Sequence, residues 1–460
     1  MRAYLRSLDP RLPREVWILQ GGGLANSFGN GIVLPFVIIY LHNVRGISLG
    51  AAGLIAAAGS ATALLSGFVA GTLADRIGPR FVLTCALLVQ SVSMSLFPLI
   101  HTAWHAFLLN SLLGLGSGAF WPSQSSLITA VSPSGRRHAA FALQRVTMSL
   151  GLAVGGLAGG LIASTAHPRT FTLLFLGDAC TFVVYAAVVA RLPAPPIHPD
   201  HAAGRYRDVV RDRPFMSYVL LNTVLMAAGM SVVVELLPPF AKNEANVSET
   251  GIGILWFVDS FVIVVAQLPV ARIVEGRRRM RGLAAMALLW AGALLGFGAA
   301  GYWFEAGAAT VAMALITCLF AVGQCLHGAI SAPLAADLAP PALLGRYMAL
   351  SSQSWQTGWI IGPAAGGFLL QHAPFALWLV TAGVSGAAAA WALALERVLP
   401  ASVRLTPRVD SIAGVPGTMP NMALTTDDPL STDAKPAPHP ADAASRLRRG
   451  GRTAPGTTRR

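Results

Sequence analysis

The segment GTLADRIGPR, residues 71–80, joins two long apolar runs of the chain, at 48–70 and 81–100. It places an aspartate, two arginines and two glycines in a short stretch, whereas the runs on either side hold no charged residue. A helix needs about 20 apolar residues to cross the hydrocarbon core of a bilayer, so each run predicts a transmembrane helix. The segment is then a charged connection at one face of a membrane.

The same alternation of apolar runs and short charged connections continues along the chain. Of its residues 54% are hydrophobic and 12% are charged, and the mean hydropathy is +0.60, which is too apolar for a soluble domain of this length. The pattern predicts an all-α integral membrane protein with twelve transmembrane helices in two six-helix halves. The expected helices are 16–41, 48–70, 81–100, 104–131, 139–166 and 171–191, then 215–240, 251–271, 282–303, 307–334, 347–371 and 374–396.

Basic residues fall mainly on one set of connections, and this predicts the orientation of the chain. The opposite set holds Arg45, Arg169 and Lys242. The rich set holds Arg76, Arg80, Arg136, Arg137, Arg191, Arg205, Arg207, Arg211, Arg213, Arg277, Arg278, Arg279, Arg281 and Arg346. Both termini are therefore expected in the cytoplasm, and the net charge of +13 is explained by topology without nucleic-acid binding.

The segment at 71–80 fills the pattern Gly-x-Leu-Ala-Asp-Arg-x-Gly-x-Arg and so resembles motif A of the major facilitator superfamily. The resemblance implies a cytoplasmic latch between the two halves, which stabilises the outward-open state. Its residues are Gly71, Asp75, Arg76, Gly78 and Arg80. Gly71 is expected to permit close helix approach, and Asp75 to cap the positive end of a neighbouring helix. The second-half counterpart keeps Arg272 and Glu275 but lacks the leading glycine.

Glycine spacings in the fifth and eleventh expected helices resemble motif C of the drug–proton antiporter branch. Glycines four apart share a face and let helix backbones touch, so they are expected to shape the contact between the halves. The set is Gly151, Gly155, Gly159, Gly160, Gly358, Gly362, Pro363, Gly366 and Gly367. Because an offset of about 207 residues superposes these two stretches, the halves are predicted to be related repeats in one orientation.

Ionisable residues inside membrane segments are costly and are usually functional, so they are candidates for proton or substrate sites. Asp259 is placed first, because it lies about eight residues into its helix, and Glu235 second, because an outer loop follows it closely. The family fold lines its cavity with the seventh helix and sets the eighth beside it, which favours both residues. Asp178 ranks lower, because the sixth helix is peripheral in that fold. The remaining candidates are His327, Arg145, Gln324, Asn26, Asn30 and Asn110. Asn110 stands where motif B of the antiporters has an arginine linked to proton coupling, so this departure puts the standard coupling scheme in doubt.

Aromatic residues and missing motifs complete the sequence evidence. Trp121, Trp256 and Trp355 form either an aromatic wall for an apolar substrate or ordinary helix packing. The chain has no nucleotide-binding loop and no motif of a metal or hydrolase site, so no catalytic residue, metal or cofactor is expected. Cys85, Cys180, Cys318 and Cys325 lie within apolar runs, without the spacing of a zinc site.

Together these features predict a multi-pass transporter of the inner or plasma membrane that works as a monomer in the lipid bilayer. The expected divisions are an N-terminal segment 1–15, a first half 16–191, a cytoplasmic linker 192–214, a second half 215–396 and a disordered tail 397–460. The favoured function is proton-coupled efflux of small, drug-like molecules. The alternatives are a proton-coupled uptake carrier or facilitator of a small metabolite, and a sensor with a transporter-like body.

Overall fold

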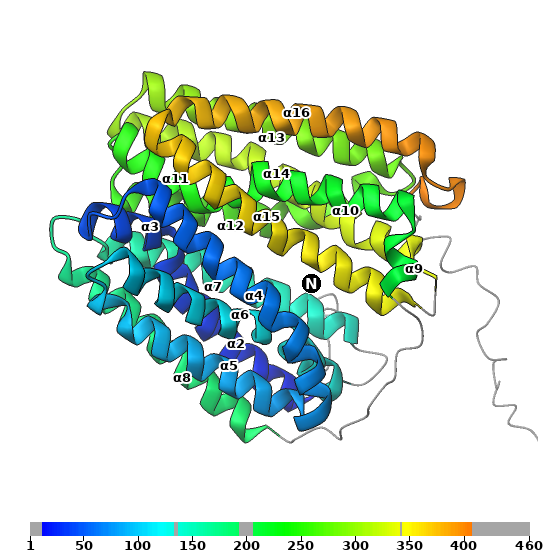
Figure 1. Ribbon diagram of the computed structural model, residues 1–460, viewed down its shortest axis with the longest axis horizontal. Coiled ribbons are helices and arrows are strands. Elements are labelled where there is room, and N and C mark those ends of the chain that lie inside the picture. The colour runs from blue at the N-terminus through cyan, green and yellow to red at the C-terminus, as the bar shows by residue number, and fades with distance from the viewer. Residues whose placement is uncertain (1–11, 133–136, 193–205, 341–342, 407–460) are drawn as a thin grey trace, which may run out of the picture. The chain divides into compact units, whose positions relative to one another are not determined.

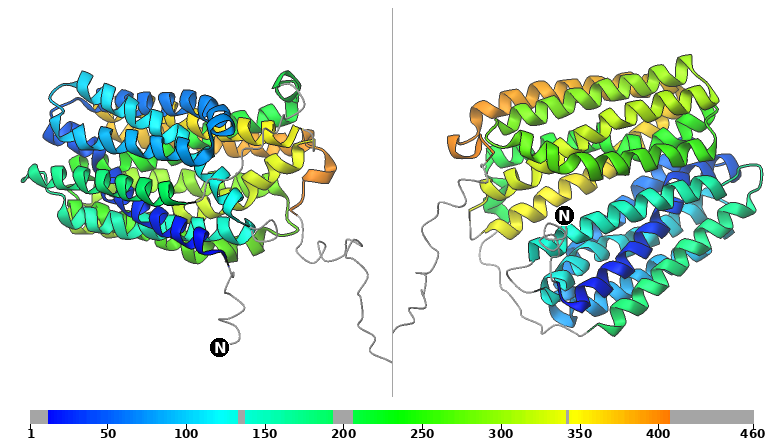
Figure 2. Two further views of the ribbon diagram at one scale, coloured as in Figure 1. Left: turned by 90° about the horizontal axis from the view of Figure 1, so that it is seen from below. Right: turned by 180° about the vertical axis from the view of Figure 1, so that it is seen from behind.

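The computed structural model describes residues 12–132, 137–192, 206–340 and 343–406, and this part of the chain is helical without a β-strand. The helices form two bundles that correspond to the two halves expected from the sequence (Figures 1 and 2). Ten helical segments among the described residues are long and apolar enough to cross a membrane. Two further long helices, α6 and α15, lie among them with 29 residues each.

The first bundle runs from residue 14 to residue 191. Its elements are α2 (Arg14–Val33), η1 (Leu34–Phe36), α3 (Val37–Ile39), η2 (Tyr40–Val44), α4 (Leu49–Ile77), α5 (Pro79–Leu96), η3 (Phe97–Leu99), α6 (Ala103–Val131), α7 (Arg137–Ile162) and α8 (Arg169–Arg191). Within it α4 packs on α6, and α2 packs on both α7 and α8.

The second bundle repeats this plan from residue 206 onward. Its elements are α9 (Tyr206–Val210), α10 (Arg213–Leu225), η5 (Met226–Met230), α11 (Ser231–Glu244), α12 (Glu249–Val274), α13 (Arg279–Trp303), α14 (Ala306–Leu338), α15 (Leu344–His372), α16 (Pro374–Val398) and η7 (Ala401–Val403). Here α12 packs on α14, and α13 packs on α14 and α16.

Hydroxyl and carboxylate side chains fix where several helices begin. Ser48, Thr102 and Ser248 each accept a hydrogen bond from a backbone N–H of the first turn of the helix that follows, and Asp212 does the same for Phe215. Such N-caps satisfy donors that have no partner within the helix. Polar residues next to the apolar runs therefore define the starts of α4, α6, α10 and α12.

Two expected boundaries differ from the structure. The motif A segment was placed in a loop, yet α4 continues through residues 71–77, and the chain turns only at Gly78, whose φ is +90°. The expected disordered tail also begins too early, because α16 extends to Val398 and the chain then folds back. The backbone N–H of Gly276 donates to the carbonyl of Thr406 at 2.9 Å, so residues up to 406 are held against the α12–α13 turn. The rest of the tail, residues 407–460, lies outside the described residues.

The most extensive contacts between the two halves come from two helix pairs, α4 with α15 and α7 with α12, and smaller ones join α3 and η1 to α11. These pairs are equivalent, since α4 and α12 are the second helices of their halves, and α7 and α15 are the fifth. The symmetry agrees with two repeats of one orientation. In Figure 1 the halves lie together near α3 and α11 and diverge toward α9. We call the first end the sealed end and the second the open end.

Candidate functional site

A cavity of about 1020 Å³ lies between the two halves. Its walls come mainly from α2 and α3, from α4 and α6, and from α15, with one or two residues from each of several other helices. Along α4 it extends from Ala52, near the sealed end, to Gly67. A space of this volume accommodates a drug-sized molecule.

Two long helices, α6 and α15, are less apolar than the ten candidate membrane spans, and both contribute many of the residues that line this cavity. From α6 it receives Ser117 and Ser125, and from α15 it receives Ser352, Gln353 and Gln356. Polar side chains are tolerated at membrane depth where they face a water-filled space instead of lipid. The low hydropathy of α6 and α15 is therefore a consequence of their position beside the cavity.

Glycines allow the helices of the two halves to touch at the sealed end. A Cβ added to Gly160 of α7 would lie 2.6 Å from the carbonyl oxygen of Glu249 and 2.9 Å from the Cα of Gly253 in α12. On the other side of the molecule Gly53 of α4 meets Gly367 of α15 in the same way. Backbones approach this closely only where no side chain intervenes.

The motif C glycines were expected to form the contact between halves, and for most of them the structure shows a different contact. Gly160, Gly367 and the carbonyl of Pro363 do reach the other half. The remaining glycines pack their helix against a neighbour in the same half: Gly151, Gly155 and Gly159 on α2, and Gly358, Gly362 and Gly366 on η5 and α11. Because successive helical residues are rotated by about 100°, adjacent glycines face different helices.

Polar contacts between the halves also lie at the sealed end. Glu249 of the second half accepts hydrogen bonds from the backbone N–H and the hydroxyl of Thr165 in the first half, at 2.9 and 2.8 Å. The same carboxylate is 3.0 Å from the ammonium of Lys242. The amide of Asn43 donates to Asn243 across the junction at 2.7 Å. The bonds that cross the junction, from Thr165 to Glu249 and from Asn43 to Asn243, must break if the sealed end is to open.

Two carboxylates line the cavity. Glu235, on α11, has no hydrogen bond or ion pair with any residue that the structure describes. Asp178, on α8, is buried, and its Oδ2 has no partner within the described chain. Gly29 of α2 makes room for Asp178, since a Cβ at residue 29 would lie 2.5 Å from the Oδ1 of Asp178 and closer still to the hydroxyl of Thr181. Helix order alone ranked Asp178 low because its helix is peripheral, but the side chain of Asp178 faces the cavity.

Asp259 and the two polar candidates of α14 lie elsewhere. Asp259 is not among the residues that line the described cavities, and its Oδ1 accepts a hydrogen bond from Gln324 at 2.7 Å. His327 is buried, and its Nε2 is 2.7 Å from the Oδ1 of Asn222. Gln324 and His327 are three residues apart on α14, yet their side chains reach different partners, on α12 and α10.

The first-half candidates are mostly at the cavity. Asn30 lines it, and Asn26 lines a smaller pocket that adjoins it. Asn110 also faces the cavity, and its amide donates to the carbonyl of Ile55 at 2.7 Å, which joins α6 to α4. The residue in the motif B position is thus a packing contact in this conformation. Arg145 of α7 lines the cavity, and its guanidinium lies next to Gly328 of α14, where a Cβ would be 3.5 Å from it.

The aromatic residues divide between the two roles expected for them. Trp121 and Trp355 line the cavity, and the Trp355 ring meets His327 edge-on at 5.4 Å between centroids. Trp256 instead fills the α7–α12 contact, where a Cβ on Gly156 would come within 2.9 Å of it. Trp359, which the sequence did not single out, joins the cavity wall one turn from Trp355.

Motif A lies at the open end. Arg80 donates to the carbonyl of Leu192 at 2.7 Å and so ties the start of α5 to the end of α8 within one half. A Cβ on Gly71 would meet no atom within 4 Å, so the close approach expected there is not made in this conformation. The side chain of Asp75 lies outside the described residues. The latch remains a prediction for a state in which the open end closes.

Comparisons with known proteins agree with this geometry. The model of the Major Facilitator Superfamily matches residues 21–294 and 219–449. An uncharacterised MFS-type transporter of Bacillus subtilis, YhjO, is 26% identical over 84% of this chain and 95% of its own length. Multidrug resistance protein MdtH of Cronobacter sakazakii is 27% identical over 77% of this chain and 89% of its own.

Solved structures show the same fold at low sequence identity. The nucleoside transporter NupG superposes with a TM-score of 0.71 at 11% identity, covering 83% of this chain and all of that one. A D-xylose–proton symporter gives 0.67 at 16% identity, over 85% of this chain and 98% of its own. With the family model covering both halves, the chain belongs to the major facilitator superfamily and resembles its multidrug branch.

Proposed function

We propose that the protein is a secondary active transporter that exports small molecules by alternating access in exchange for protons. The observation that carries the proposal is the cavity of about 1020 Å³ between two symmetric halves, bounded at one end by touching glycines. A site between two repeats is exposed to each side of the membrane in turn when the halves rock. The named relative MdtH, a multidrug resistance protein, supports export of drug-like molecules.

The orientation is also part of the proposal. All twelve long helical segments would cross the membrane, with both termini in the cytoplasm and the bilayer being the inner or plasma membrane. The connections at the open end carry most of the arginines, whereas Arg45, Arg169 and Lys242 lie toward the sealed end. Because positive loops remain on the cytoplasmic side, the structure would be an inward-facing state.

Cysteine labelling tests this orientation. Exposed residues are available at both ends: Arg211 at the open end and His167 at the sealed end. In intact cells, a membrane-impermeant maleimide should label His167→Cys and leave Arg211→Cys unlabelled until the cells are lysed. The unsubstituted protein is the control for its own cysteines. Labelling of Arg211→Cys in intact cells would reverse the proposed orientation.

Protons are proposed as the coupling ion because the cavity holds carboxylates without a cationic partner among the described residues. Glu235 and Asp178 both face it, and neither forms a described ion pair. A carboxylate in such surroundings favours binding a proton when the site loses water. Release of that proton on the opposite side would couple export to the proton gradient.

Transport by everted membrane vesicles tests the function directly. Vesicles that contain the protein should accumulate a fluorescent cationic dye such as ethidium when respiration acidifies their lumen. A protonophore should collapse that accumulation, and vesicles without the protein set the baseline. Accumulation that ignores the protonophore would contradict proton coupling and favour a facilitator. Movement of probes only in the opposite direction would favour an uptake carrier.

A further inference from the structure

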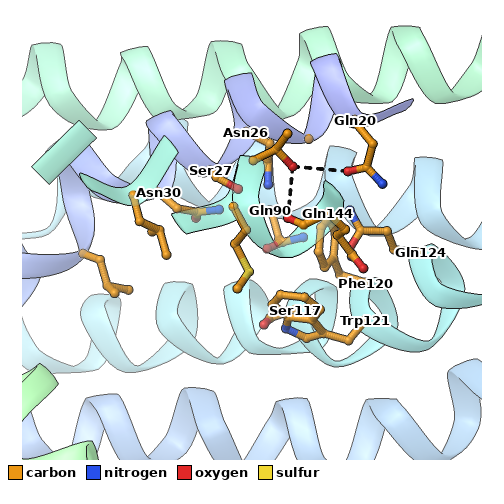
Figure 3. Close-up of a pocket in the computed structure, with 15 residues that line it drawn as sticks. Gln20, Asn26, Ser27, Asn30, Gln90, Ser117, Phe120, Trp121, Gln124 and Gln144 are labelled. Atoms are coloured by element: carbon orange, nitrogen blue, oxygen red, sulfur yellow. Dashed lines mark hydrogen bonds between the residues drawn. The ribbon is translucent and has the colours of Figure 1, made fainter. Parts of the chain in front are cut away.

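A second pocket, of about 230 Å³, branches from the central cavity into the first half (Figure 3). The two spaces share five lining residues: Asn30, Leu34, Gln90, Ser117 and Trp121. Amide side chains dominate the branch: Gln20, Asn26, Asn30, Gln90, Gln124 and Gln144. None of its lining residues carries a charge, whereas the central cavity contains Arg145, Asp178 and Glu235.

Hydrogen bonds hold several of these amides in fixed orientations. Gln144 donates to the carbonyl oxygen of Gln124 at 2.6 Å, and Gln124 in turn donates to the hydroxyl of Tyr185 at 2.8 Å. The hydroxyl of Thr147 donates to Gln20 at 3.3 Å. A network whose members are fixed by one another presents a defined pattern of donors and acceptors. The pocket is therefore a built site, with side chains from α2, α6 and α7 facing one another.

Asn26 has unused hydrogen-bonding capacity inside this pocket. Its side chain is 3% exposed, and its Oδ1 has no partner in the described part of the chain. An amide offers an acceptor oxygen beside two N–H donors, and a buried acceptor without a partner is unfavourable. A ligand that places a donor against Asn26 would remove that penalty.

We propose that this amide-lined pocket is a subsite for an uncharged ring that carries adjacent hydrogen-bond donors and acceptors, as in a glycoside or a nucleoside. Amides recognise such paired groups through two parallel hydrogen bonds. The rings of Trp121 and Phe120 meet edge-on, with 5.2 Å between their centroids. They supply an aromatic surface for the flat or apolar side of the ligand ring. The absence of lining charge disfavours a free cation or anion here.

The size of the pocket indicates that it holds only part of a substrate. At about 230 Å³ it is smaller than a typical site for a drug-sized ligand, whereas the adjoining cavity is large enough for the remainder. This inference rests on the proposed transport function, because it assigns the substrate class of that same cavity. It predicts that substrates combine a neutral polar ring with a second, bulkier group.

Equilibrium binding of two small neutral probes tests the subsite. Tritiated uridine and ¹⁴C-labelled methyl α-D-glucopyranoside would be measured by scintillation proximity on the purified full-length protein. We expect one or both to bind wild type and to bind about tenfold more weakly to Asn26→Leu, which keeps the side-chain size but loses the hydrogen bonds. Gln144→Met should weaken binding similarly, and it provides a second test of the pocket if Asn26→Leu does not fold. The probe that binds distinguishes a nucleoside from a sugar ligand.

Gln267→Met is the matched control, because Gln267 of α12 lines neither the central cavity nor the amide pocket and instead donates to the carbonyl of Cys325 at 3.3 Å. It should bind the neutral probe within twofold of wild type. The assignment would be overturned if all three variants lost probe affinity equally, or if Asn26→Leu bound the probe as tightly as wild type does. A wild type that exports ethidium but binds neither probe overturns the subsite alone. A wild type that binds a probe but moves no probe or dye contradicts the transport function and leaves the subsite standing.

Discussion

Replacing Glu235 by glutamine should abolish proton-driven accumulation while substrate exchange continues. Glu235 faces the cavity and has no partner among the described residues, so its proton can exchange with water there. Glutamine keeps the size and hydrogen bonding of the side chain but cannot titrate. With an imposed gradient of two pH units, one-for-one exchange supports about a 100-fold concentration ratio, and the ratio should fall to about 1 in the variant.

Reconstituted proteoliposomes allow accumulation and exchange to be measured on one preparation. Asp259→Asn is the matched control, because Asp259 is hydrogen-bonded to Gln324 and does not line a described cavity. Depth within the helix placed Asp259 first in the sequence, whereas we now propose Glu235 as the carrier because it lines the cavity. Full accumulation by Glu235→Gln would exclude Glu235 as the carrier. In that case Asp178→Asn becomes the decisive variant, since Asp178 is the other carboxylate in the cavity.

The positions of most helices could be predicted from the sequence, because long apolar runs leave few alternatives in a membrane. The ends were less certain, since a helix can continue past the apolar run for as long as its backbone is satisfied. Thus α4 includes most of motif A and stops only where Gly78 adopts a positive φ. Similarly, residues 401–406 look like the start of a polar tail, yet backbone hydrogen bonds to the α12–α13 turn hold them in place.

The rotation of each helix about its axis could not be predicted from the sequence alone. Spacing showed that the motif C glycines share faces, but it did not show whether a face meets the other half or a neighbour in the same half. Asp178 illustrates the same limit, because its helix is peripheral while its side chain faces the cavity. The amide pocket was missed for a related reason. Its residues come from α2, α5, α6 and α7, and only Asn26 and Asn30 share a visible spacing.

The largest conformational effect is expected from Gly53→Val. A side chain at residue 53 would overlap the backbone carbonyl of Pro363 and crowd Gly367, and neither backbone can yield without separating α4 from α15. The clash exists only while the sealed end is closed. Overpacking costs about 1–3 kcal/mol, which would shift the equilibrium about fivefold to 150-fold away from the sealed state. Transport should fall strongly, because the cycle requires both states.

The shift can be measured from the rate at which an impermeant maleimide labels Leu41→Cys, a buried position of the cavity wall near the sealed end. In intact cells Leu41→Cys should be labelled faster when Gly53→Val is also present. Gly160→Val should have the same effect, because a side chain at residue 160 would crowd the backbone of Glu249 and Gly253 at the equivalent contact. Gly383→Val in α16 is the control, since a Cβ there meets no atom within 4 Å. If Gly53→Val is labelled and transports like Gly383→Val, the glycine contact is not the barrier. The bonds from Thr165 to Glu249 and from Asn43 to Asn243 would then become the candidates for holding this end closed.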